Sequence, residues 1–228
     1  MRQETIDKLK ESGWYDRLKS VFDSPEWEQC INQISNLYRT KKVYPEPPNI
    51  LRAFYETKYN DCKVIILLQD PYHDGSATGI AMANENSIKI SPSLEKFKDR
   101  IETDFHDGLL LDFDYSLLDY CKQGVLFLNT ALTVEQKTPG SHTEIWKPVT
   151  KLLVREISSY VSGGVWILMG GKAREFEPYI NKFSSNILRC EHPAAASYDK
   201  RQWNDSGVLA ETNNILIGQN GPGSEIKW

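Results

Sequence analysis

The stretch Val64-Ile65-Ile66-Leu67-Leu68, followed at once by Gln69-Asp70-Pro71-Tyr72-His73, decides the fold class of this chain. An uninterrupted apolar run of this length, bounded by a turn signal, is typical of a strand that is buried on both faces. Pro71 cannot donate to a neighbouring strand and fixes its own φ, so the chain turns there and places Asp70 and Tyr72 at the rim of the sheet. The carboxyl ends of strands are where open α/β sheets bind their ligands. On its own, a turn of this composition is more often a solvated strand end than a site.

Four short apolar runs predict four buried strands. They cover residues 62–69, 124–129, 164–169 and 186–190, and the chain between successive runs is long enough for a helix. Helix starts are marked by Ser24-Pro25 and by Ser91-Pro92, each followed by an apolar stripe with helical spacing. The alternation predicts an α/β fold, a single domain over residues 1–228 with a central parallel four-stranded sheet flanked by helices on both faces.

Polar or small residues follow each predicted strand. The first strand ends at Asp70, the second at Asn129, the third at Gly170-Gly171 and the fourth at His192. Because parallel strands share one carboxyl edge, we expect Asp70, Asn129 and His192 to meet in one crevice. A carboxylate can serve as a base or counter-charge, an imidazole can donate to a leaving group, and an amide can pair with a nucleobase. Each residue also has an ordinary structural explanation, and only their combination indicates a site.

The composition limits the classes of function. The 228 residues are 40% apolar and 25% charged, enough for one core, and their formal net charge is −4. A nucleic-acid partner therefore needs a local basic patch on an acidic background. No apolar stretch approaches the ~18 residues that span a bilayer, and the first residues carry no apolar signal segment. We therefore expect a protein that is intracellular, is not secreted and has no membrane partner.

Several common site types lack their sequence signatures. The cysteines at positions 30, 62, 121 and 190 lie far apart, which argues for buried thiols and against a zinc or iron–sulfur site. Gly170-Gly171-Lys172 lacks the spacing of a nucleotide triphosphatase loop. The G-x-G-x-x-G and G-x-S-x-G patterns do not occur either, so dinucleotide enzymes and serine hydrolases lose support.

Three blocks of the sequence resemble the signature blocks of family 1 uracil-DNA glycosylases. They are residues 69–73, residues 124–133, and His192-Pro193 with Ser197. Residues 90–94 are similar to the proline-rich DNA-contacting loop of that family, residues 167–171 to its glycine-serine loop, and residues 226–228 to its terminal tryptophan segment. The resemblance runs from about Trp14 to Trp228. It implies an enzyme that removes uracil from DNA by hydrolysing the N-glycosidic bond, with no metal and no organic cofactor.

The resemblance also implies a role for each residue of the crevice. Asp70 would stabilise the positive charge that develops on the sugar and orient water, and His192 would donate to uracil O2. Asn129 would pair with N3–H and O4 of a uracil flipped out of the stack, a pattern that cytosine reverses. Tyr72 would stand against C5 and exclude the methyl group of thymine. Main-chain amides near Gln69 would add contacts to the base.

Two positions of the base pocket depart from the family pattern. Leu68 stands where the family has glycine, and Met82 stands where a phenylalanine stacks on the base. Methionine still covers a ring through contacts worth ~0.3–1.5 kcal/mol, so we expect weaker base affinity. Main-chain amides near Ser93, Gly171 and Ser197 would hold phosphates of the DNA.

The family's serine, proline and wedge leucine are all alanines in this chain. Ala196 takes the DNA-contacting wedge position, but it is too small to fill the gap left by a flipped nucleotide. We expect Tyr198 to fill this gap, with Trp203 as second candidate, or else a preference for single-stranded DNA. Lys200 and Arg201 would supply the local positive charge, although such a pair is ordinarily a solvated surface loop.

The leading hypothesis is a monomeric base-excision repair glycosylase that acts on uracil in single- or double-stranded DNA. Its further partners would be a proteinaceous glycosylase inhibitor or a replication protein, and it would work where DNA is, in the cytoplasm of a bacterial or infected cell or in a nucleus. The main alternative is a catalytically weak or inactive DNA-binding or replication accessory protein of the same fold. A weaker alternative is a glycosylase for another 5-substituted uracil, against which Tyr72 argues. The joint presence of Asp70, Tyr72, Asn129 and His192 favours the enzyme.

Overall fold

A four-stranded parallel sheet forms the centre of the computed structural model, which describes residues 2–84, 90–109 and 112–228. The strands are β2 (Val64–Leu68), β3 (Val125–Asn129), β5 (Val165–Met169) and β6 (Asn186–Cys190), in the spatial order β3-β2-β5-β6. All neighbouring pairs are parallel, and Leu68 at the end of β2 lies beside Asn129 at the end of β3. The four predicted strands and their common carboxyl edge are therefore confirmed. The expected burial holds for β2, β3 and β5 but is wrong for β6, which lies at the edge of the sheet, is only partly buried and exposes Arg189.

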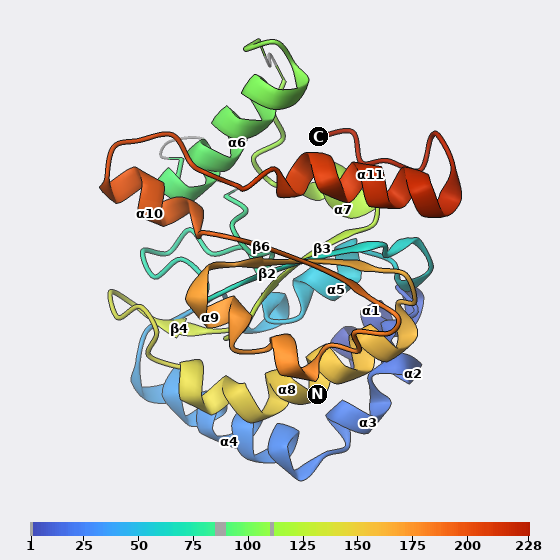
Figure 1. Cartoon of the computed structure of the whole chain (residues 1–228). Helices are drawn as coiled ribbons and strands as arrows, with labels where there is room; N and C mark the ends of the chain where they lie inside the picture. Colours follow the sequence, from blue (N-terminus) through green and yellow to red (C-terminus); the bar gives the residue numbers. More distant parts are fainter. Residues whose placement is uncertain (1, 85–89, 110–111) are drawn as a thin grey trace.

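Helices cover both faces of the sheet (Figure 1). One layer contains α1 (Gln3–Glu11), α2 (Trp14–Arg17), α3 (Lys19–Phe22), α4 (Pro25–Thr40), α5 (Arg52–Glu56), α8 (Thr143–Tyr160) and α9 (Gly170–Arg174). The other contains α6 (Pro92–Phe105), α7 (Leu118–Lys122), α10 (Pro193–Tyr198) and α11 (Val208–Asn220). Alternate residues of each strand serve the two layers: Ile65 and Leu67 pack into the first, and Val64, Ile66 and Leu68 into the second. This two-sided burial is why β2, β3 and β5 are almost entirely apolar.

The predicted helix starts are confirmed by their capping geometry. The Ser24 hydroxyl accepts a hydrogen bond from the Trp27 amide at 3.1 Å, and Pro25 occupies the first helical position of α4. The Ser91 hydroxyl caps α6 in the same way through the Leu94 amide. The second cap matters for function because it fixes where α6 begins, next to the carboxyl edge of the sheet.

Several short elements were not predicted from the sequence. The antiparallel pair β1 (Val43–Tyr44) and β4 (Val134–Glu135) and the 3₁₀ turns Pro47–Asn49, Tyr59–Asp61 and Glu177–Tyr179 are two or three residues long, too short to show a period. The four cysteines are buried free thiols. Among the described residues, no helix has the length and apolar character needed to cross a membrane.

Candidate active site

A cavity of about 450 Å³ opens at the carboxyl edge of the sheet. Its lining includes all six residues predicted to act on the base or on the glycosidic bond: Gln69, Asp70, Tyr72, Met82, Asn129 and His192. Leu68 also lines the cavity, with 3% of its surface exposed, and does not close it. Parallel topology thus brings together side chains that are more than a hundred positions apart in the chain.

Asp70 is held by a backbone amide from a distant loop. The Gly140 N–H donates to Asp70 Oδ2 at 2.6 Å. Burial raises the pKa of the Asp70 carboxyl above its ordinary 3.8, while the Gly140 amide and the nearby His73 act in the opposite direction. A partly desolvated carboxylate in a fixed orientation is suited to facing a developing positive charge. Gly140 was not predicted to belong to the site, because its only signal in the sequence is the Pro139-Gly140 turn.

His192 is fixed as a neutral hydrogen-bond donor. It caps α10, and its Nδ1 accepts a hydrogen bond from the Ala194 amide at 3.1 Å, so its proton resides on Nε2. Burial lowers the pKa of the imidazole below 6.5, which keeps it uncharged at neutral pH. A Cβ atom on Gly170, whose φ is +87°, would come within 3.0 Å of His192 Cβ. Glycine at this position therefore gives the histidine its room.

Asn129 offers an unused acceptor. It is the last residue of β3 and is 7% exposed, and its Oδ1 has no hydrogen-bond partner within the described part of the chain. Leaving a buried polar atom without a hydrogen-bond partner costs about 1–3 kcal/mol of stability. Such an atom in a cavity therefore indicates a ligand that donates a hydrogen bond to it. The amide pairs with a planar donor–acceptor edge such as that of a nucleobase.

Tyr72 is locked between two other residues of the site. Its hydroxyl donates to the Met82 carbonyl at 2.8 Å and accepts from the Ser91 hydroxyl. Met82 has a φ of +67°, a left-handed conformation that is uncommon for residues other than glycine. Burial raises the pKa of the Tyr72 phenol, so it stays protonated. The aromatic ring is therefore a rigid wall of the cavity.

Two of the three predicted phosphate-contacting residues lie next to the cavity. Ser93 lines the cavity near the start of α6, and Ser197 in α10 ties the two helices together by donating to the Pro92 carbonyl at 3.0 Å. Gly171 is exposed in α9, after β5. Tyr198 lines the cavity and is 87% exposed.

Three expectations about the segment after His192 need correction. Ala196 is completely buried in the core beneath α10, so its side chain does not face DNA. Tyr198 follows two residues later on the same helix, about 200° further round, which turns it outward. Trp203 is 2% exposed and donates to the Glu191 carbonyl, so it is not an alternative wedge. Arg201 forms a two-pronged ion pair with Glu191 at 2.5 and 2.7 Å, which offsets its charge, whereas Lys200 is exposed.

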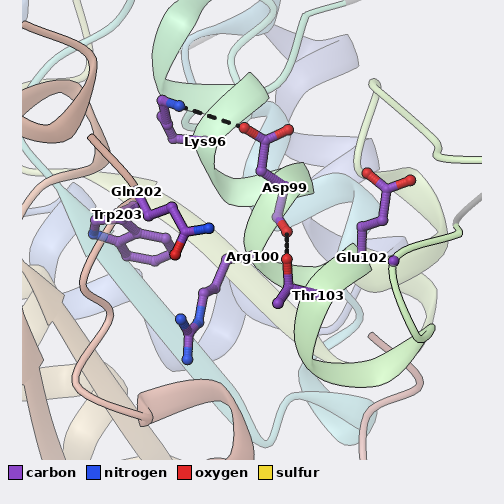
Figure 2. Close-up of a pocket in the computed structure, with 8 residues that line it drawn as sticks. Lys96, Asp99, Arg100, Glu102, Thr103, Gln202 and Trp203 are labelled. Carbon is purple, nitrogen blue, oxygen red and sulfur yellow. Dashed lines mark hydrogen bonds and ion pairs between the residues drawn. The ribbon is translucent and has the colours of Figure 1, made fainter. Parts of the chain in front are cut away.

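A second cavity, of about 250 Å³, lies between α6 and Gln202-Trp203 and is lined by none of the residues predicted to act on the base or on the glycosidic bond. Figure 2 shows its charged side chains arranged along α6. Lys96 pairs with Asp99 at 3.5 Å, and Arg100 pairs with Asp104 at 2.8 Å. Because these charges are paired locally, the cavity at the sheet edge is the stronger candidate for catalysis.

The chain is similar to known proteins in sequence and in fold. The model of the Uracil DNA glycosylase superfamily matches residues 54–217. The Uracil-DNA glycosylase of Flavobacterium johnsoniae is 31% identical, covering 92% of this chain and 96% of its own length. That of Borrelia turicatae is 36% identical, covering 83% and 86%. The crystal structure of mimivirus uracil-DNA glycosylase superposes with a TM-score of 0.83 at 19% identity, covering 96% of this chain and 88% of its own.

Proposed function

This chain belongs to the uracil DNA glycosylase superfamily, and we propose that the cavity at the edge of its sheet is where it carries out the family's reaction. The protein is a DNA-repair hydrolase that excises uracil by cleaving the N-glycosyl bond. The observation that carries the assignment of the site is the meeting of Asp70, Asn129 and His192 in one cavity.

The chemistry follows from the charges that develop as the bond breaks. Cleavage builds positive charge on the sugar and negative charge on the departing uracil. The C1′–N1 bond breaks and its electron pair leaves with uracil. The Asp70 carboxylate stabilises the sugar cation and orients the attacking water, whose oxygen bonds to C1′ and whose proton passes to solvent. The neutral His192 donates from Nε2 to uracil O2 and so stabilises the anionic leaving group. Fixed groups of this kind need little reorganisation during the reaction.

Base selection uses two different devices. Asn129 Oδ1, which has no partner in the described part of the protein, accepts a hydrogen bond from uracil N3–H. The Asn129 amide nitrogen donates a hydrogen bond to uracil O4. Cytosine would leave these groups mismatched, at a cost of about 1–3 kcal/mol each. The locked ring of Tyr72 excludes the methyl group of thymine by size, because hydrogen bonds alone do not distinguish thymine from uracil. Gln69 and Met82 complete the lining on which the base rests.

DNA is held by the groups around the mouth. Amides near Ser93, Gly171 and Ser197 bind phosphates, and Tyr198 fills the gap left when the nucleotide flips from a duplex. Lys200 adds positive charge at the same rim. Both single- and double-stranded DNA are substrates under this proposal.

Finer parts of the proposal rest on family membership. Mimivirus UNG Y322L has been crystallised in complex with UGI, so we infer that a proteinaceous inhibitor can also capture this chain. We further infer one glycosylase domain over residues 1–228, a monomer that needs no cofactor and works where DNA is, in the cytoplasm of a bacterial or infected cell or in a nucleus, with a replication protein as a further partner.

The test is uracil release from single- and double-stranded oligonucleotides. Asp70→Asn should reduce release at least about a hundredfold, because it removes the charge that faces the sugar cation. Asp119→Asn, on α7 and exposed, is the matched control and should behave as the unaltered protein. Tight binding of uracil-containing DNA without release by the unaltered protein would instead favour the non-catalytic accessory protein.

A further inference from the structure

Most of the positively charged side chains near the cavity already have partners within the protein. The formal net charge of the chain is −4. Arg201 is paired with Glu191, Lys172 pairs with Glu175 at 2.8 Å, and the Arg174 guanidinium donates to a backbone carbonyl. A phosphate would have to compete with these partners, so the electrostatic attraction must come from elsewhere on the rim.

Lys137 lies beside the cavity in the loop that follows β4. Its backbone N–H donates to the carbonyl of His73, a cavity-lining residue, at 2.9 Å. Two residues further on, Pro139 lines the cavity itself, and the next residue, Gly140, holds Asp70. Lys137 is exposed, and within residues 2–84, 90–109 and 112–228 no carboxylate forms an ion pair with it. Its charge is therefore available at the edge of the site.

The backbone of Lys137 has a conformation that favours glycine over lysine. Its φ is +61°, in the left-handed region where glycine is the least strained choice. Lys200 shows the same combination: it is exposed, has a φ of +53° and, over the described ranges, has no ion-pair partner. Lys200 lies two positions after Tyr198, and Tyr198 lines the same cavity as His73. Figure 1 shows the loop after β4 and helix α10 on either side of the sheet edge.

We propose that Lys137 binds a backbone phosphate of the uracil-bearing strand, on the rim opposite Lys200, so that the two lysines clamp the strand across the cavity. The inference rests on the proposed function and extends it, because Lys137 lies outside the motifs that resemble the family. A lysine in a conformation that favours glycine is explained if its side chain, and not its backbone, is what the site needs.

Counterion release gives the proposal a quantitative readout. For single-stranded DNA, each neutralised phosphate contributes about 0.7 to the slope of log affinity against log salt concentration. Removing the Lys137 charge should therefore reduce the slope by about 0.7. Between about 50 and 200 mM salt, the affinity of the variant should then fall about 2.5-fold less than that of the unaltered protein.

The experiment measures binding of a uracil-containing single-stranded oligonucleotide by fluorescence anisotropy over this salt range. Lys137→Gln removes the charge and should show the smaller slope. Lys122→Gln, an exposed lysine on α7, is the matched control and should leave the slope unchanged. Lys137→Gly should show the same reduced slope with no loss of thermal stability, because glycine suits the left-handed backbone.

The outcomes separate the two proposals. Equal slopes for Lys137→Gln, Lys137→Gly and the unaltered protein, measured while the unaltered protein releases uracil, overturn the role of Lys137 alone. Absence of uracil release by the unaltered protein overturns the proposed function, whatever the slopes. A reduced slope accompanied by unfolding of both Lys137 variants would also contradict the proposal, because it assigns Lys137 no structural role.

Discussion

Replacing Tyr198 by alanine tests how this protein manages without the family's wedge leucine. Tyr198 is 87% exposed at the end of α10 and lines the mouth of the cavity. Stacking of a base on an aromatic side chain is worth about 1–3 kcal/mol, which corresponds to roughly 5- to 150-fold in rate if the contact stabilises the flipped state. A duplex needs this support because its gap must stay filled, whereas a single strand has little to hold open.

The assay compares kcat/KM for uracil release from matched single- and double-stranded oligonucleotides. Tyr198→Ala should lose roughly 5- to 150-fold on duplex and distinctly less on the single strand. Tyr198→Phe keeps the ring and should stay close to the unaltered protein on both substrates. Equal losses on the two substrates with Tyr198→Ala would refute the wedge role.

The reciprocal substitution is Ala196→Leu, which restores the residue type of the family. Ala196 has no exposed surface and packs into the core beneath α10. Extra methylene groups there should cost about 1–3 kcal/mol of stability through overpacking and should not raise duplex excision. A faster duplex reaction with an unchanged unfolding free energy would show that position 196 can reach the DNA after all.

Two further predictions concern the site interior. Activity should fall on the acidic side as Asp70 takes up a proton, at a pKa above 3.8, while His192, whose pKa lies below 6.5, stays neutral at pH 7. A profile of kcat/KM from about pH 4 to 8 checks this, and the residual activity of Asp70→Asn should lack the Asp70 ionisation. Tyr72→Phe removes the hydroxyl that Met82 and Ser91 share and should lower the unfolding free energy in urea by about 1–3 kcal/mol. Thymine should still be rejected by Tyr72→Phe, because the ring remains.

The central sheet was predictable because β2, β3 and β5 are nearly uninterrupted apolar runs. Burial on both faces forces that composition, and parallel pairing forces the strand ends to a common edge. The convergence of Asp70, Asn129 and His192 followed from these two facts without knowledge of any contact. The short pair β1 and β4 carries no comparable signal, because two residues do not define a period.

The segment around α10 was harder because the direction of a side chain depends on helical phase. The sequence Ala194-Ala195-Ala196 has no polar residue to mark an outer face, so the burial of Ala196 and the exposure of Tyr198 could not be read from it. The ion pair of Arg201 was not predictable for a different reason. Its partner Glu191 lies ten positions away across the helix, and this ion pair depends on how the segment folds back.

Burial raises the pKa of Asp70 and lowers that of His192, which favours the form that the reaction needs for His192 but opposes it for Asp70. Desolvation disfavours the charged form of both groups, so it raises the pKa of the carboxyl and lowers that of the imidazole. For the imidazole this is what a neutral donor requires, and the Ala194 amide on Nδ1 supports the same form. For the carboxyl it opposes the anion, and the Gly140 amide offsets it from a loop seventy positions away. The strand ends therefore supply the two reacting groups, while the loop after β4 helps to keep one of them charged.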